Sequence, residues 1–364
     1  MLEVEMLLAG HGDALLVEYG EPGQPHRILI DGGPYYAYDD PGGLRERLHG
    51  LLQAGRNEFE LLIVTHVDTD HIDGVIRLLQ DPALAGLKFK DIWFNGWKHL
   101  QPEATGVLAG KHGEYLGALL EDLDLPWNTH EKLAGGPVMV PEEGELPTFD
   151  LDGNARLTLL SPGPKELDNL RKEWPKSLGT ADFLPGDKDG ALEQLRNRAR
   201  YGPPKGVLGT KPDDSAANGS SIAALLEHGS ERVLLAGDAW PQVLVRSLGR
   251  WSARHGGPPA VRDFKLAHHG SFGNQRKDLI RSVRTERYLI STSSAFFGHP
   301  DPETIRLIVK HDQHEEGKVP ELVFNYLSPS SERWVTQDEE QEQKLGYKSS
   351  FPTGAVWRPP SERA

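Results

Sequence analysis

The sequence predicts a globular protein of the α/β class. Of its 364 residues, 37% are hydrophobic, and 40 glycines and 27 prolines are spread along the chain, as is typical of a folded protein with many turns. Helix-like and strand-like segments alternate over much of the chain. Several strand-like segments run directly into short polar motifs that are rich in histidine and aspartate. A chain of this length can bury a sizeable core.

The composition excludes several kinds of site. The chain has no cysteine, so disulfides and thiolate ligands are excluded and any metal site must use His, Asp or Glu. A formal net charge of -14 argues against a uniformly basic surface for nucleic acid, although a local patch or a metal pair could still receive a phosphate. The first residues carry no basic segment, and no apolar stretch approaches the ~20 residues of a membrane span. We therefore expect a cytoplasmic protein that does not enter a membrane.

The first elements form a β-meander. Strands are expected over residues 3–9, 14–19 and 27–31, and the third ends at Asp31 in "DGG", where two glycines permit a tight turn. Leucines at helical spacing predict a helix over residues 42–52. The elements expected next are a strand at 59–64, a helix at 74–80, a strand at 91–94, a helix at 113–123 and a strand at 156–160.

Residues 165–211 differ in character from the rest of the chain. They hold two amphipathic segments, and ten Lys and Arg stand there against seven Asp and Glu. We predict a mildly basic, helical insertion. The series Arg196, Arg198 and Arg200 is typical of a solvent-exposed helix face. Alternatively, these arginines contact the substrate.

Strands resume at residues 221–226, 232–236, 263–267 and 288–291, and "GHPDPETI" starts a helix. We predict one main domain over residues 1–330 and a C-terminal extension or tail over 331–364. The extension is polar apart from an apolar cluster at 355–357.

The strand at 59–64 leads into "THVDTDHIDG", which places His66, Asp68, Asp70 and His71 at the spacing H-x-D-x-D-H. Alternate residues of an extended segment point the same way, so His66 and Asp68 can face one ion. If the chain turns into a helix near Ile72, Asp70 and His71 can be directed to a second ion. Two divalent ions about 3.5–4 Å apart are a standard device for hydrolysis at phosphorus or carbonyl centres.

Further candidate ligands follow later strands. Asp238 comes after the apolar run "VLLAG", and a short carboxylate in that place suits the bridging of two cations. His268 and His269 follow "FKLA" in the same manner. Each motif is weak when taken alone, because Gly-Asp is a common turn and a histidine pair is often structural. Together they predict a two-metal site.

The motifs "THVDTDHIDG", "LLAGDAW", "LAHHGS" and "GHPDPE", preceded by "GHGDALLVEYG" and "RILIDGG", resemble the metallo-β-lactamase superfamily. Within it, the closest resemblance is to the hydrolase domain of ComEC-type competence proteins, here without the membrane channel. The resemblance runs from about residue 3 to about residue 312. It implies a four-layer αββα sandwich with the metal site at one edge of the sheets.

The resemblance also implies residue roles. His66 and Asp68 match the positions that bind the first metal, Asp70 and His71 those that bind the second, and Asp238 the bridging position. The late histidine is His269, with His268 as its substitute. Two further positions carry roles by the same match: Asp31 organises the site from behind the ligands, and His299 acts as general acid or phosphate clamp. Ser271 is a candidate substrate contact.

The chain departs from the family in two ways. Asp68 stands where histidine is commoner, and oxygen ligands favour Mn²⁺ or Mg²⁺ beside Zn²⁺. The family's middle histidine is missing before the strand that leads to Asp238, and Asn218 or Ser220 is expected in its place. Occupancy of the first site is therefore open. Asp73 replaces the usual glycine, and we expect it to cap the following helix.

These features favour a metal-dependent phosphodiesterase or nuclease that uses Asp70 and His299 with metal-bound hydroxide. The expected cofactors are two divalent ions, and the expected partner is nucleic acid as substrate, with a protein partner or a homodimer also open. One alternative is hydrolysis of a small phosphodiester, lactone or thioester. Another is a non-catalytic or partner-activated module of a larger complex.

Overall fold

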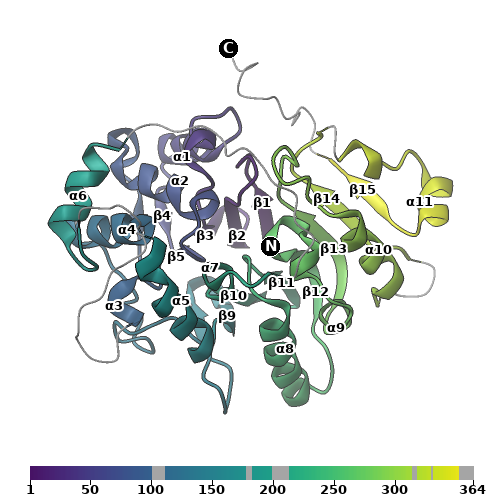
Figure 1. The fold of residues 1–364 in the computed structure, drawn as a ribbon. Helices are drawn as coiled ribbons and strands as arrows, with labels where there is room; N and C mark the ends of the chain where they lie inside the picture. The colour runs from purple at the N-terminus through teal and green to yellow at the C-terminus, as the bar shows by residue number, and fades with distance from the viewer. Residues whose placement is uncertain (101–110, 178–182, 199–212, 314–317, 329–330, 352–364) are drawn as a thin grey trace.

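The computed structural model describes residues 1–364 except 101–110, 178–182, 199–212, 314–317, 329–330 and 352–364. Two mixed β-sheets lie at its centre, with helices on either side (Figure 1). The basic position Arg200 and the apolar cluster at 355–357, both singled out in the sequence, lie outside the described residues.

The first sheet has five strands in the order β1-β2-β3-β5-β7. The meander β1 to β3 is antiparallel, and β5 and β7 then add in parallel. The strands are β1 (Leu2–Met6), β2 (Leu15–Glu21), β3 (Gln24–Ile30), β5 (Leu61–Ile63) and β7 (Ile92–Trp93). A separate pair is formed by β4 (Glu58–Phe59) and β6 (Lys88–Phe89).

The second sheet has eight strands in the order β15-β14-β13-β12-β11-β10-β9-β8. Its strands are antiparallel from β8 to β11 and parallel from β11 to β15. They are β8 (Thr148–Leu151), β9 (Ala155–Ser161), β10 (Ala223–His228), β11 (Glu231–Leu235), β12 (Ala260–Lys265), β13 (Arg284–Ile290), β14 (Glu321–Phe324) and β15 (Lys348–Ser350). Part of the predicted C-terminal extension therefore forms an edge strand.

Three apolar clusters define four layers. Tyr19 and Trp93 of the first sheet share a buried cluster with Phe149 and Leu157 of the second, so the two sheets pack face to face. A second cluster joins the outer face of the first sheet to one helical layer, and a third does the same for the second sheet. The predicted αββα arrangement is confirmed.

Helices of the first layer are α1 (Leu44–Gln53), α2 (Thr69–Gln80), α3 (Trp97–Leu100), α4 (Lys111–Asp122), α5 (Pro164–Ser177) and α6 (Lys188–Arg196). The remaining helices are α7 (Ala216–Gly219), α8 (Pro241–His255), α9 (Lys277–Arg281), α10 (Pro302–His311) and α11 (Glu339–Leu345). Short 3-10 turns are η1 (Tyr35–Ala37), η2 (Pro82–Leu84), η3 (Asp152–Asn154), η4 (Ala267–Gly270), η5 (Phe272–Asn274) and η6 (Glu332–Trp334).

Within residues 165–211 the structure describes two helices, α5 and α6, which place their apolar faces in the second cluster, against the outer face of the first sheet. The sequence reading did not identify α8, a 15-residue helix that begins with Pro241. Among the helices that the structure describes, none is both long enough and apolar enough to cross a membrane.

The "DGG" motif holds α2 against the end of β3. Gly33 has a φ of +74°, which gives the expected turn. Gly32 instead lets the backbone of α2 approach closely. A Cβ on Gly32 would lie 2.4 Å from the backbone nitrogen of Val75, and one on Gly74 would lie 1.8 Å from the oxygen of Gly32. The two backbones are also joined by a bond from Gly32 N–H to the oxygen of His71, at 2.8 Å. The start of α2 is thereby fixed beside Asp31.

Candidate metal centre

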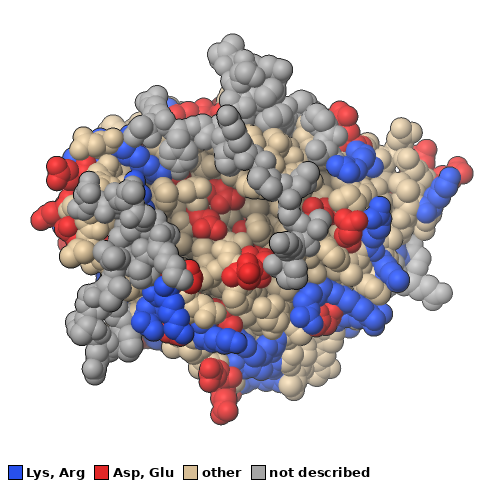
Figure 2. Space-filling model, viewed as in Figure 1, with Lys and Arg blue, Asp and Glu red and all other residues tan. Residues whose placement is uncertain are grey.

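The candidate site lies where parallel strands of both sheets end. Asp31 follows β3 and His66 follows β5, whereas Asp238 and the His268–His269 pair follow β11 and β12. Because carboxyl ends of neighbouring parallel strands share one edge of a sheet, residues distant in sequence meet there. Figure 2 shows acidic side chains in a hollow of this face, near the position of α2 in Figure 1.

The first turn of α2 carries two candidate ligands. The helix begins at Thr69, earlier than the expected turn near Ile72, and so includes Asp70 and His71. Asp68 occupies the N-cap position, but its side chain makes no capping hydrogen bond among the described residues. One carboxylate oxygen instead lies 3.6 Å from Nε2 of His66. Asp68 is therefore directed toward the other candidate ligands.

Four histidines surround the carboxylate of Asp238. Its Oδ2 lies 3.4 Å from Nε2 of His71, 3.8 Å from that of His66, 3.8 Å from that of His268 and 4.0 Å from that of His269. Asp238 is 2% exposed, at the middle of the cluster.

Asp70 joins this cluster from α2. Its Oδ2 lies 3.4 Å from Nε2 of His269 and 3.9 Å from Nε2 of His71. The ligand atoms of Asp70, His71 and His269 lie within 4.8 Å of one another, and so do those of His66, His71 and Asp238. The sequence-predicted ligands are thus brought together.

The Nδ1 atom of His66 faces two hydroxyls, Oγ1 of Thr65 at 3.0 Å and Oγ of Ser221 at 3.1 Å. The Thr65 hydroxyl donates its own hydrogen to Asp31 at 2.7 Å, so it can only accept from the histidine. Nδ1 of His66 therefore carries a hydrogen, and Nε2 is left to face the cluster. Ser221 was not singled out from the sequence.

His71 and His269 are oriented in the same way. Nδ1 of His71 donates to Asp31 at 2.8 Å, and Nδ1 of His269 donates to the backbone oxygen of Ser291 at 2.9 Å. A carboxylate and a carbonyl can only accept, so each Nδ1 carries a hydrogen. An acceptor behind each ring is the usual arrangement for histidines that bind metal through Nε2.

The turn after β12 has an uncommon backbone. His268, His269 and Gly270 are consecutive residues in the left-handed region, with φ of 49, 55 and 84°. Non-glycine residues adopt this conformation rarely, and such residues cluster at functional sites. The turn allows both neighbouring imidazoles to face Asp238.

The donor set fits a cation. In the described part of the chain, Nε2 of His66, His71 and His269 and Oδ1 of Asp238 are buried without a hydrogen-bond partner. Buried polar atoms are rarely left without partners, since each costs about 1–3 kcal/mol. Imidazole and carboxylate donors suit Zn²⁺ and Mn²⁺.

The pKa values of these residues also indicate a cation site. Burial acts to raise the pKa of Asp238, but His71, His268 and His269 outweigh it and hold the pKa well below its ordinary value. Burial acts to lower the pKa of His71, yet Asp238, Asp31 and Asp70 raise it well above the usual range. Without a cation, protonated histidines therefore balance the charge of the ionised carboxylates, and metal binding would displace those protons from the histidines.

A buried ion pair lies behind His269. Nζ of Lys265 lies 2.6 Å from Oδ2 of Asp13, and Oδ1 of Asp13 lies 3.3 Å from Nδ1 of His269. Burial acts to raise the pKa of Asp13, but Lys265 and His269 hold it below its ordinary value. The sequence reading assigned Asp13 no role, although it precedes the apolar strand β2 within "GHGDALL".

The remaining predicted residues lie around this cluster. Asn218 and Ser220 belong to the turn around α7, where the Ser220 hydroxyl donates to the oxygen of Ala217 at 2.6 Å. The buried Ser271 follows the left-handed turn. His299 has its ring centroid 5.7 Å from that of His268.

His299 also has a carboxylate partner, since its Nδ1 lies 3.3 Å from Oδ1 of Asp301. Burial lowers the pKa of His299, although Asp301 acts to raise it. His299 is therefore neutral near pH 7 in the free protein, and the negative charge of a bound phosphate would favour its protonation.

Asp73 is not a helix cap, so that prediction is wrong. It lies in the second turn of α2, is buried, and accepts two 2.9 Å bonds from Arg198. Burial raises the pKa of Asp73 to about 7, although Arg198 acts to lower it. The side chain of Arg198 therefore pairs with Asp73 and is not exposed to solvent, whereas that of Arg196 is exposed at the end of α6.

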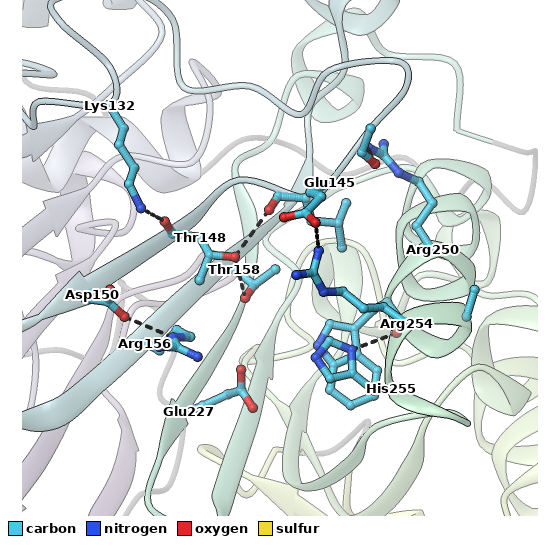
Figure 3. A pocket seen from close by; sticks show the side chains of 14 residues that line it. Lys132, Glu145, Thr148, Asp150, Arg156, Thr158, Glu227, Arg250, Arg254 and His255 are labelled. Carbon is cyan, nitrogen blue, oxygen red and sulfur yellow. Dashed lines mark hydrogen bonds and ion pairs between the residues drawn. The ribbon is translucent and has the colours of Figure 1, made fainter.

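A separate cavity of about 610 Å³ is lined by basic and acidic side chains of β8, β9 and α8 (Figure 3). Its cations are engaged within the protein: Arg156 with Asp150, Arg254 with Glu145, and Lys132 with the oxygen of Thr148. None of the candidate metal ligands lines this cavity.

No family model matches the chain, and no curated protein matches it. Among solved structures, it is similar to CmlA, a diiron β-hydroxylase from Streptomyces venezuelae, with 14% identity and a TM-score of 0.40. That match covers 86% of this chain but 52% of CmlA, so the chain spans about half of its length. A "putative metal-dependent hydrolase" from Parabacteroides distasonis matches at 11% identity and TM-score 0.34, over 96% of this chain and 93% of the other. The fold assignment rests on the sheets and clusters described above.

Proposed function

We propose that this protein is a metal-dependent hydrolase that cleaves phosphodiester bonds, with nucleic acid as its substrate. The observation that carries the proposal is the set of buried Nε2 atoms, without hydrogen-bond partners among the described residues, around the carboxylate of Asp238. The resemblance of the sequence motifs to ComEC-type hydrolase domains supports the choice of substrate.

His66 and Asp68 would hold one ion, and Asp70, His71 and His269 would hold the other. Asp238 lies between the two groups and would contact both ions. When bound, a pair of divalent ions supplies Lewis acidity toward a phosphoryl oxygen and lowers the pKa of water.

The other residues would position the ligands and the substrate. Asp31 fixes the ring of His71 by accepting its Nδ1 hydrogen. His299, beside the cluster, would accept a proton as a phosphate binds and then donate to that phosphate or to the leaving oxygen. The exposed Arg196 offers a phosphate contact.

The test combines metal analysis with cleavage assays. Purified protein is analysed for bound metal and then incubated with single- and double-stranded DNA and RNA in Mn²⁺, Mg²⁺ or Zn²⁺. Asp70→Asn is compared with Asp124→Asn, which changes an exposed carboxylate outside the cluster. We expect cleavage by wild type and Asp124→Asn, and loss of cleavage in Asp70→Asn.

Three outcomes would contradict the proposal. Undiminished cleavage by Asp70→Asn would disprove the site. Metal binding without cleavage of any nucleic acid would redirect the assignment to a small phosphodiester, lactone or thioester. Protein that binds no metal under any condition would instead indicate a non-catalytic module.

A further inference from the structure

The two halves of the proposed centre are unequal in ligand number. The second ion would have Asp70, His71 and His269 in addition to the shared Asp238. The first ion would have His66 and Asp68 in addition to the same Asp238. The first side therefore has one ligand fewer, and the sequence lacks the expected histidine before β11.

We infer that His268 supplies this ligand, so that the tandem histidines after β12 serve one ion each. Nε2 of His268 lies 3.8 Å from Oδ2 of Asp238, the same distance as Nε2 of His66. This inference rests on the proposed two-metal function and adds a ligand to its first site.

The ring of His268 is oriented like those of the other three histidines. Its Nδ1 lies 2.8 Å from Oδ1 of Asn274. The amide nitrogen of Asn274 donates to Oδ2 of Asp213 at 2.8 Å and to the backbone oxygen of Asp238 at 3.2 Å. Because both neighbours are acceptors, the amide oxygen must face His268, and Nδ1 of His268 carries the hydrogen. Nε2 is left to face Asp238.

Of the two residues expected in place of the missing histidine, Asn218 lies near Nδ1 of this ring and Ser220 bonds within its own turn. The amide nitrogen of Asn218 donates to Asp213 at 2.9 Å and lies 3.4 Å from Nδ1 of His268. The Ser220 hydroxyl is used by its own turn. Asn218 thus contributes to the polar group that supports His268 from behind.

The exposure of these groups predicts how the first ion behaves. The side chain of His268 is 28% exposed and that of Asp68 is 42% exposed, whereas those of His66, His71 and His269 are at most 2% exposed. The first ion would therefore lie at the open side of the centre, beside His299. We expect it to exchange more readily than the second.

The test measures zinc stoichiometry and affinity in His268→Asn. Asparagine is chosen because position 268 has φ 49, a conformation that asparagine tolerates better than most residues. Chelator-treated protein is reloaded with Zn²⁺, dialysed and analysed for metal, and competition with a zinc chelator gives the affinities. The control is His49→Asn, an exposed position on α1.

Wild type and His49→Asn are expected to retain two ions per chain. His268→Asn is expected to retain one, with affinity for the other about tenfold or more weaker. Two ions of unchanged affinity in His268→Asn would overturn the inference and leave the proposed function intact. Wild type that holds a single ion, also held by the variant, would overturn it as well. No zinc in wild type would contradict the proposed function itself.

Nitrogen NMR of ¹⁵N-labelled wild type gives a second measurement that does not depend on the folding of a variant. Saturation with Zn²⁺ is expected to shift the Nε2 resonances of four imidazoles, those of His66, His71, His268 and His269. A count of three would overturn the role of His268 even if His268→Asn does not fold.

Discussion

The two halves of the proposed metal centre differ in what stands behind their ligands. On the second side, the carboxylate of Asp31 and a backbone carbonyl accept from His71 and His269. On the first side, hydroxyls accept from His66 and an amide oxygen accepts from His268. A charged acceptor makes an imidazole a stronger ligand than a neutral one does. The second ion should therefore be held more tightly and the first should exchange.

The largest effect is expected from the residue that both halves share. Asp238→Asn keeps the size of the side chain and removes its charge from the midst of four histidines. Loss of an outer acceptor typically costs 10–100-fold, so loss of this ligand should lower affinity for both ions by more than about 100-fold. Metal analysis and phosphodiester cleavage rates would measure the effect.

The matched control is Asp150→Asn, which changes an exposed carboxylate on β8. If Asp238→Asn lost one ion and kept the other at wild-type affinity, Asp238 would be a ligand of one ion only, and the two halves of the centre would not share it.

A smaller and one-sided effect is expected from Asp31→Asn. Asp31 accepts three hydrogens, from the N–H and hydroxyl of Thr65 and from Nδ1 of His71. An amide has a single oxygen, so at least one donor would meet the NH₂ group. Affinity for the second ion should fall about 10–100-fold, and affinity for the first should fall less. Chelator titration resolves the two, and a larger loss at the first ion would reverse the comparison.

Ser221→Ala should act mainly on the first side. It removes one of two hydroxyls near Nδ1 of His66, where Thr65 remains as an acceptor, and it also removes the acceptor of the Asp238 N–H at 3.1 Å. Affinity for the first ion should therefore fall about tenfold or less, with a smaller fall at the second. Ser220→Ala is the matched control, because the neighbouring hydroxyl bonds to Ala217. Equal effects of the two variants would show that the Ser221 contact contributes nothing specific.

Much of the fold could be predicted from sequence because its signals are local. Apolar runs that end in polar motifs predict the strands before His66, Asp238 and His269. Because the carboxyl ends of parallel strands lie at one edge of a sheet, these three residues are expected close together. The predicted start of α2 is too late, because "TDH" belongs to the helix and not to the turn before it. Asp73 therefore does not cap the helix, and its partner is Arg198, 125 residues away.

The outer contacts could not be predicted, since they depend on how distant segments pack. Ser221 and His66 are 155 residues apart, and Asp13 and Lys265 are 252 residues apart. A serine or an aspartate beside a strand is ordinary in sequence, and its role becomes visible only when the sheets are stacked. The role inferred for His268 has the same origin, because both tandem histidines suited the same predicted position.

The smallest effect on the centre is expected from the layer beneath its second side. Glu114 lies in α4, which packs against α2, and its carboxylate accepts from Trp174 Nε1 and from the N–H of Gly186. Burial raises the pKa of Glu114 to about 7, although these two hydrogen bonds act to lower it. Folding therefore favours the protonated acid. Its contribution to stability is complete below the unfolded pKa of 4.5 and is lost as pH rises through about 7.

Glu114→Gln supplies a neutral side chain at every pH. The variant should match wild type near pH 4.5 and exceed it by roughly 1–3 kcal/mol in free energy of unfolding at pH 8, with both ions still bound at wild-type affinity. Urea unfolding of metal-free protein across this range measures the difference, and Asp122→Asn, at an exposed position on the same helix, is the control. A change in affinity for the second ion would mean that its tight binding depends on packing beneath α2, and the difference between the halves could then not be assigned to Asp31 alone.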